Sequence, residues 1–182
     1  MKKVLLFLSI FAFGIWGCSE NTNLTGPEKI DSQQTILKTT SNSSAMLTKT
    51  TASKTINGDF GGLIPLNLES EDEETGAKGW LYLPRNSFDG EKTISVTVVD
   101  GLAALDFEPS GTSFELPAHL TVQFNGVEFD DDDTDDIDFQ FIASDGSLVP
   151  VEYRKLIVNK KYGWVIVIDA KLEHFSRYGF TK

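Results

Sequence analysis

The chain has 182 residues, of which 40% are hydrophobic and 24% charged, so it is long enough and apolar enough to bury the core of one domain. Its 27 acidic residues outnumber its 16 basic residues and give a net charge of −11. This acidic balance argues against binding to nucleic acid or to anionic lipid head groups, because both require clustered Lys and Arg side chains.

The N-terminus has the pattern of a bacterial lipoprotein signal peptide. Lys2 and Lys3 are followed by an apolar run over residues 4–15, and Gly17 precedes Cys18. The run is too short to span a bilayer comfortably, which is typical of a signal peptide rather than a transmembrane helix. We therefore predict that the leader is removed and that Cys18 is acylated, palmitate being one such acyl chain. The alternative is an ordinary secretory signal with an accidental cysteine.

Acylation of Cys18 would place the mature protein on a lipid tether in the cell envelope. Several acyl chains on one terminus give durable membrane attachment. Cys18 is the only cysteine, so no thiol would remain for disulfides or metal binding. The residue after the cysteine is Ser19 and not the Asp that commonly retains lipoproteins at the inner membrane, so we favour the outer membrane. The sequence leaves open whether the domain faces the periplasm or the exterior.

Composition divides the chain into three regions. Residues 1–17 form the predicted signal peptide, and residues 18–55 contain the lipidated cysteine and a Ser/Thr/Asn-rich segment without aromatic residues. Such a segment cannot bury enough apolar surface to offset the entropy of ordering it, so it is predicted to be a flexible, disordered linker. Ile36–Leu37 is too isolated to change that prediction. Residues 56–182 are predicted to form the folded domain.

The domain is predicted to be all-β, an antiparallel β-sandwich. Thr93–Val98 alternates polar and apolar residues with a period of two, as does Asp138–Phe141. No stretch keeps helical periodicity for three turns, and short strands separated by Gly, Pro and Asp are typical of sandwiches. The predicted strands are 56–68, 78–84, 93–99, 118–124, 137–143, 148–158, 162–169 and 172–180.

One aromatic pair lies in the second predicted strand. Trp80 and Tyr82 alternate with Leu81 and Leu83, so one pair faces the core and the other faces water. If the aromatic pair is exposed, it forms a small platform of the kind on which sugars stack. If it packs inward, it is ordinary core.

Residues 130–138 form the most acidic stretch of the chain, and carboxylates on a loop are the ligands that Ca²⁺ prefers. Asp136 and Ile142 stand where an EF-hand has its turn Gly and its bidentate Glu, so weak Ca²⁺ binding would be of another kind. The alternative is a solvated hairpin tip whose self-repulsion discourages edge pairing. The candidate Ca²⁺ ligands are Asp131, Asp133, Asp135 and Asp138.

Signatures of a turnover enzyme are missing from the sequence. The chain has only two histidines, His119 and His174, and neither has the spacing of a zinc ligand. No nucleophile elbow, P-loop or dinucleotide fingerprint is present. We therefore do not predict a turnover enzyme, and weak Ca²⁺ is the only cofactor under consideration.

Two segments of the predicted domain match ordered motifs of a known family. They are Phe107–Leu120 and His174–Tyr178, preceded in the chain by Gly61–Gly62 and by Pro84. In this order they resemble the ZU-five domain of ankyrins, netrin receptors and the death-domain protein PIDD, which also has related copies in bacterial surface and lipid-anchored proteins. The resemblance covers residues 56–182 and implies a β-sandwich.

In some relatives of that family, His-Phe-Ser is a self-cleavage site. The resemblance implies that Ser176 attacks the carbonyl of Phe175 to form an ester that water hydrolyses, with His174 assisting the proton transfers. In a regular strand His174 and Ser176 would share a face about 6.5–7 Å apart, so cleavage requires a local kink. The alternative is that these side chains only pack within the last strand.

Together these features predict a lipid-anchored module of the cell envelope with a binding or structural role. The lipid on Cys18 would contact the membrane, and the partner would be an envelope or extracellular protein that the sequence does not identify. Nucleic acid is not expected as a partner. One alternative is a self-cleaving domain at Phe175–Ser176, and another is a Ca²⁺-dependent adhesive module that uses residues 130–138.

Overall fold

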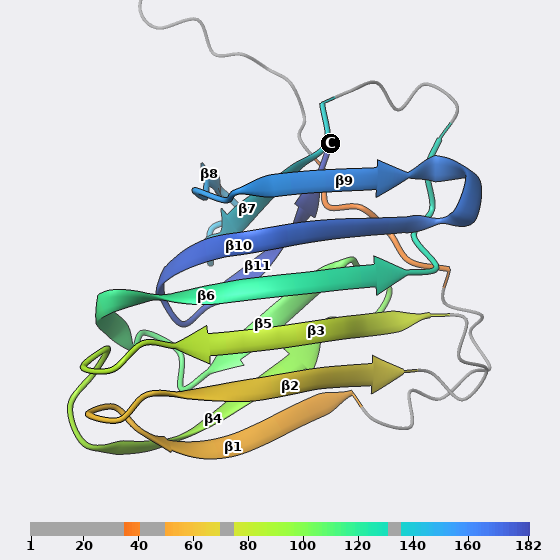
Figure 1. Ribbon diagram of the computed structural model, residues 1–182. Coiled ribbons are helices and arrows are strands. Elements are labelled where there is room, and N and C mark those ends of the chain that lie inside the picture. Colours follow the sequence, from red (N-terminus) through yellow and green to blue (C-terminus); the bar gives the residue numbers. More distant parts are fainter. Residues whose placement is uncertain (1–34, 41–49, 70–74, 131–135) are drawn as a thin grey trace, which may run out of the picture. The chain divides into compact units, whose positions relative to one another are not determined.

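The computed structural model describes residues 35–40, 50–69, 75–130 and 136–182. Within these ranges the chain is nearly all β, and its strands form two antiparallel sheets that lie one behind the other (Figure 1). The predicted antiparallel β-sandwich is therefore confirmed. Cys18 and the predicted signal peptide lie outside the described residues. No helix in the described ranges is long and apolar enough to cross a membrane.

The six-stranded sheet contains both the first and the last strand of the domain. β11 lies in its interior, where it pairs with β5 on one side and β7 on the other. In spatial order the strands are β1 (Thr51–Asn57), β4 (Glu91–Val98), β5 (Ala104–Glu108), β11 (Arg177–Thr181), β7 (Asp138–Ile142) and β8 (Leu148–Pro150).

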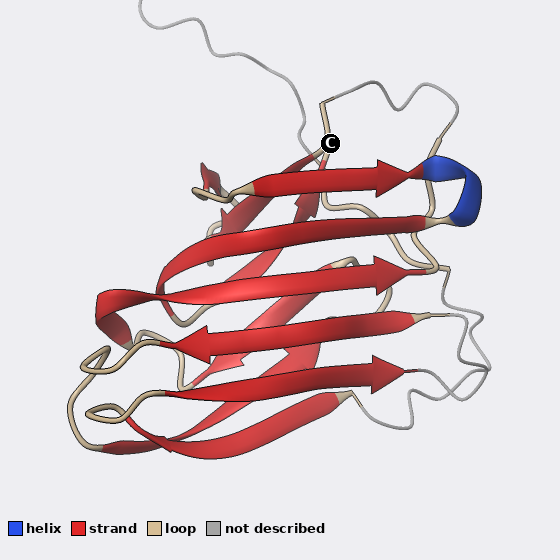
Figure 2. Ribbon diagram, viewed as in Figure 1, coloured by secondary structure: helices blue, strands red, loops and turns tan. Residues whose placement is uncertain are grey.

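The five-stranded sheet is nearest the viewer in Figure 1. In spatial order its strands are β2 (Gly62–Glu69), β3 (Gly76–Leu83), β6 (Ser113–Asn125), β10 (Trp164–His174) and β9 (Lys155–Asn159). A 3₁₀ turn, η1 (Lys160–Tyr162), joins β9 to β10 and is the one helical element in the described ranges (Figure 2).

The hydrophobic core fills the space between the sheets. Strand alternation supplies it, since Ile64, Leu66 and Leu68 of β2 are buried while the residues between them are exposed. Aromatic side chains from both sheets contribute to it, and several of their rings meet edge to face, the arrangement that aromatic quadrupoles favour. The largest fully buried side chains are Tyr178, Phe107, Phe124, Phe139, Phe175 and Phe180.

Several strand boundaries differ from the prediction. The predicted strand 56–68 is two strands, because the chain turns at Gly61, whose φ of 65° suits glycine. β5 was not predicted, because three of its five residues are buried and it lacks a clean alternation. The predicted break between 162–169 and 172–180 is wrong as well, since β10 runs through to His174 and the chain turns at residues 175–176.

The folded domain begins earlier than the predicted boundary at residue 56. β1 starts at Thr51, and residues 35–40 are already bound to the domain. Leu37 is only 1% exposed, and its N–H donates to the carbonyl of Phe180 while its own carbonyl accepts from Ala103. The prediction of a flexible linker is therefore wrong for these residues, because backbone pairing and one buried leucine hold a segment whose composition indicates disorder.

Candidate functional site

The predicted self-cleavage motif lies at the turn between β10 and β11. His174 is the last residue of β10 and Arg177 is the first of β11, so Phe175 and Ser176 form the connection. The chain therefore bends at the Phe175–Ser176 bond and does not continue as one regular strand. Phe175 is fully buried and Ser176 partly exposed.

Three backbone hydrogen bonds hold the peptide groups around this bond. The N–H of Phe175 donates to the carbonyl of Thr112 at 2.8 Å, and the N–H of Phe107 donates to the carbonyl of Ser176 at 3.0 Å. The N–H of Gly111 donates to the carbonyl oxygen of Phe175 at 2.9 Å. A backbone N–H aimed at a carbonyl oxygen is the kind of donor that stabilises an oxyanion when that carbonyl is attacked.

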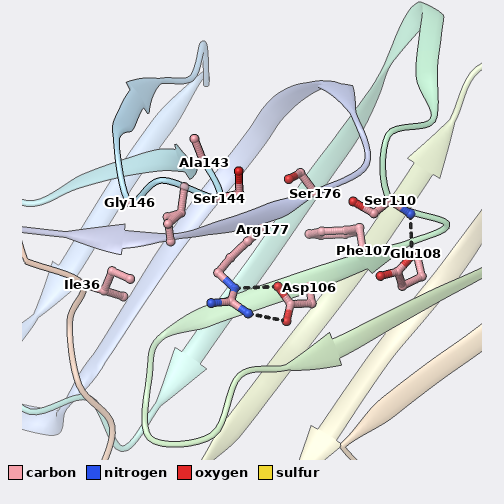
Figure 3. Close-up of a pocket in the computed structure, with 11 residues that line it drawn as sticks. Ile36, Asp106, Phe107, Glu108, Ser110, Ala143, Ser144, Gly146, Ser176 and Arg177 are labelled. Carbon is pink, nitrogen blue, oxygen red and sulfur yellow. Dashed lines mark hydrogen bonds and ion pairs between the residues drawn. The ribbon is translucent and has the colours of Figure 1, made fainter.

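Ser176 lines a cavity of about 490 Å³. Figure 3 shows residues that line this cavity, with the side chain of Arg177 directed at Asp106. Arg177 makes two hydrogen bonds to Asp106, from Nε to Oδ1 at 2.7 Å and from Nη2 to Oδ2 at 2.9 Å, and this contact raises the pKa of Arg177. The open cavity gives water a route to the Ser176 hydroxyl.

His174 lines a different cavity, of about 200 Å³. Its ring meets Phe141 edge to face at 4.7 Å, and its Nδ1 lies 3.4 Å from the Tyr178 hydroxyl. That hydroxyl donates to the carbonyl of His174 at 2.8 Å, and burial raises the pKa of Tyr178, which keeps it a neutral donor. The structure thus brings His174 together with Tyr178, while Ser176 faces the cavity beside Asp106.

Asp138 is the one candidate Ca²⁺ ligand within the described residues, because Asp131, Asp133 and Asp135 lie outside them. Its Oδ1 accepts a hydrogen bond from the Tyr153 hydroxyl at 2.8 Å and one from the N–H of Phe139 at 2.8 Å. Burial, together with this contact to Asp138, raises the pKa of Tyr153 to about 12. Among the described residues, no three or more His, Cys, Asp or Glu side chains gather as metal ligands would.

The aromatic pair of β3 lies on the outer side of the five-stranded sheet. Trp80 is 48% and Tyr82 45% exposed, while Leu81 and Leu83 are fully buried, so the exposed arrangement is the one observed. Leu63 of β2 lies opposite Tyr82 and is 45% exposed. We call the surface over β2, β3 and β6 the aromatic face; its members are Leu63, Pro65, Trp80, Tyr82, His119 and Thr121.

A His–Asp pair lies at one edge of the aromatic face and includes His119. β10 carries a bulge between Val167 and Ala170, and within it Asp169 has a φ of 61°. Its Oδ1 lies 2.7 Å from Nδ1 of His119, and its N–H donates to the hydroxyl of Thr121 at 3.1 Å. The His119 ring lies 6.2 Å from the ring of Tyr82.

Sequence reasoning missed this pair. The available signal was an aspartate inside the dense apolar run 164–170, where strands usually exclude it. That signal points to a bulge, but it does not identify His119, which is 50 residues away, as the partner. No protein-family model matches the chain, and no curated protein or solved structure was found to match it.

Proposed function

We propose that the protein is a lipid-anchored module of the bacterial cell envelope that binds a partner through its aromatic face. The observation that carries this proposal is the exposure of Trp80 and Tyr82 next to Leu63. Single exposed apolar side chains are ordinary, but a contiguous group that includes aromatic residues is typical of interaction surfaces. No described element lies in front of this sheet in Figure 1.

Membrane attachment is a separate part of the proposal and rests on the signal-peptide pattern that ends at Cys18. A Cys18→Ser variant should lose incorporation of radiolabelled palmitate and should leave the membrane fraction. Label on the variant, or its unchanged fractionation with membranes, would contradict lipid anchoring through Cys18. This result is independent of whether the aromatic face binds anything.

Photocrosslinking in cells tests the binding role. Benzoylphenylalanine at Leu63 leaves Trp80 and Tyr82 intact and reacts with C–H bonds of any organic partner, whether protein or glycan. We expect higher-mass adducts from this position and none from the same probe at Tyr162, an exposed aromatic position in η1. Adducts from neither position, or equal adducts from both, would refute a specific role of the aromatic face.

Self-cleavage at Phe175–Ser176 is a second candidate, favoured by the turn and by the N–H of Gly111. The hydroxyl oxygen of Ser176 would attack the carbonyl carbon of Phe175, and the developing negative charge on the carbonyl oxygen would meet that N–H. The C–N bond then breaks, the hydroxyl proton passes to the freed amine of Ser176, and an ester results. Water hydrolyses the ester to a carboxylate on Phe175 and a free hydroxyl on Ser176.

Intact-mass spectrometry under denaturing conditions tests self-cleavage. A species ending at Phe175 should be present in the wild type and absent in Ser176→Ala. Ser110→Ala is the matched control, because this serine lines the same cavity and has no proposed role in the reaction. Denaturation is needed because β11 pairs on both sides and would hold the fragment 176–182 in the sheet. A single full-length mass would reject this candidate.

A further inference from the structure

We infer that the aromatic face binds a neutral polysaccharide, an inference that rests on the proposed binding role of this face. It comes from three features together: two half-exposed aromatic side chains two residues apart, an aspartate in the left-handed region that meets a histidine beside them, and two ion pairs on the surrounding surface.

Trp80 and Tyr82 lie two residues apart on the outer side of β3. Their exposures of 48% and 45% leave a large part of each side chain open to solvent. Residues two apart on a strand share a face and lie about 6.5–7 Å apart, so the two rings form a short row. The C–H faces of sugar rings in a polysaccharide are apolar and flat, and they can stack on such a row, as other apolar groups do on aromatic rings.

The pair of His119 and Asp169 supplies polar groups at the side of this row. The left-handed backbone region is unfavourable for most residues other than glycine, and the φ of Asp169 is 61°. The bulge that imposes this conformation aims the carboxylate at His119, whose Nδ1 it meets at 2.7 Å. Because Nδ1 is engaged, Nε2 of His119 and the second oxygen of Asp169 remain as groups that can accept hydrogen bonds from sugar hydroxyls.

Two lysines around the face are paired with acidic side chains, and this favours an uncharged ligand. Lys78 pairs with Glu69, and Lys171 pairs with Glu152 at 2.6 Å. A charged ligand would have to compete with these partners. A protein large enough to cover the face would also have to desolvate the pairs, which is costly. A narrow, uncharged chain of sugars can instead lie on the rings and leave the pairs hydrated.

Affinity electrophoresis of the full mature chain in native gels tests the inference. The probes are four neutral polysaccharides (hydroxyethylcellulose, xyloglucan, glucomannan and laminarin), with anionic alginate as the charged comparison. We expect at least one neutral polysaccharide to slow the wild type. Trp80→Ala should weaken this binding by about tenfold or more, as loss of a central aromatic contact usually does. Tyr162→Ala, which removes an exposed aromatic residue outside the face, should leave binding unchanged.

Asp169→Gly separates binding from folding. Glycine adopts the backbone conformation of Asp169 without strain, so the melting temperature should be maintained while loss of the carboxylate weakens retardation in the gel. A purely structural role of the His119–Asp169 pair predicts the opposite, a lower melting temperature with unchanged retardation.

Three results would overturn the inference: no retardation by any neutral polysaccharide, retardation by alginate alone, or retardation that survives Trp80→Ala. The crosslinking experiment separates this failure from that of the proposed function. A protein adduct from Leu63 without polysaccharide binding would keep the aromatic face as a binding surface and reject the polysaccharide. Neither adduct nor retardation would reject both.

Discussion

The backbone N–H of Gly111 donates a 2.9 Å hydrogen bond to the carbonyl oxygen of Phe175, and this bond joins two turns that are far apart in the chain. One turn connects β5 to β6 and the other connects β10 to β11. The Phe175 ring stacks on Phe107 at 5.9 Å and meets Phe114 edge to face at 4.7 Å. Because Phe107 and Phe114 stand on either side of the first turn, the two turns form one packed unit.

Phe175→Ala should therefore destabilise the protein strongly. Removing a fully buried phenylalanine from a core costs about 3–5 kcal/mol, since transfer energy is lost and a cavity remains. Urea denaturation would measure the change. Phe60→Ala is the matched control, because Phe60 is 72% exposed and its loss should change the free energy of unfolding by no more than about 0.5 kcal/mol. Equal effects of the two substitutions would contradict this packing.

Gly79→Ala should loosen the contact between β3 and β6 beneath the aromatic face. A Cβ at Gly79 would lie 2.0 Å from the backbone oxygen of Thr121, so the two strands would have to separate. We expect a loss of about 1–3 kcal/mol or more, the usual cost of overpacking. A Cβ at Gly146 would meet nothing within 4 Å, so Gly146→Ala reports only the cost of its φ of 83°. A smaller effect at Gly79 than at Gly146 would refute the close approach.

The sequence predicts the fold class. It also predicts which residues of a strand share a face, because residues in β2, β3 and β4 alternate with a period of two. Alternation does not say which face is inward, so the outward orientation of Trp80 and Tyr82 depends on which side of β3 the second sheet packs against. The pairing of His119 with Asp169 depends on a bulge, which shifts the register by one residue and has no local signature beyond the misplaced aspartate.

Leu37 marks a different limit of sequence reasoning. It is a single apolar residue in a polar segment, and its burial depends on a site formed by residues distant in the chain, including Ala103 and Phe180. Propensity and composition describe the cost of ordering a segment, but not the existence of such a site. The same reason explains why the cavity beside Ser176 could not be predicted, since residues of β5, β7 and β11 and of the turns next to them line it together.

Leu37→Ala should detach residues 35–40 from the domain. Truncating a buried leucine costs about 2–5 kcal/mol, and here the cost falls on one short segment. We expect trypsin to cleave after Lys38 much faster in the variant, because in the wild type backbone hydrogen bonds on both sides of Lys38 protect this site. Phe60→Ala, at an exposed position outside this segment, should leave the cleavage rate unchanged. Equally rapid cleavage of the wild type would contradict the docking of this segment.

Tyr153 should make stability fall at alkaline pH. Its pKa is raised from 10.0 to about 12 in the folded protein, first by burial and then by Asp138. Below pH 10 the hydroxyl is neutral in both states, so its contribution is fully present. Between pH 10 and about 12 the unfolded chain loses this proton while the folded chain keeps it, so the free energy of unfolding decreases as the pH rises.

Urea denaturation across that pH range should show that the free energy of unfolding declines less steeply with pH in Tyr153→Phe than in the wild type, because the variant has no proton to lose at this position. Asp138→Asn should lie between the two, since it removes the carboxylate that accepts the Tyr153 hydrogen bond but leaves the burial in place. If the free energy of unfolding falls with pH at the same rate in all three proteins, Tyr153 does not control the loss of stability at alkaline pH. A slope in Asp138→Asn equal to that of the wild type would assign the raised pKa of Tyr153 to burial alone.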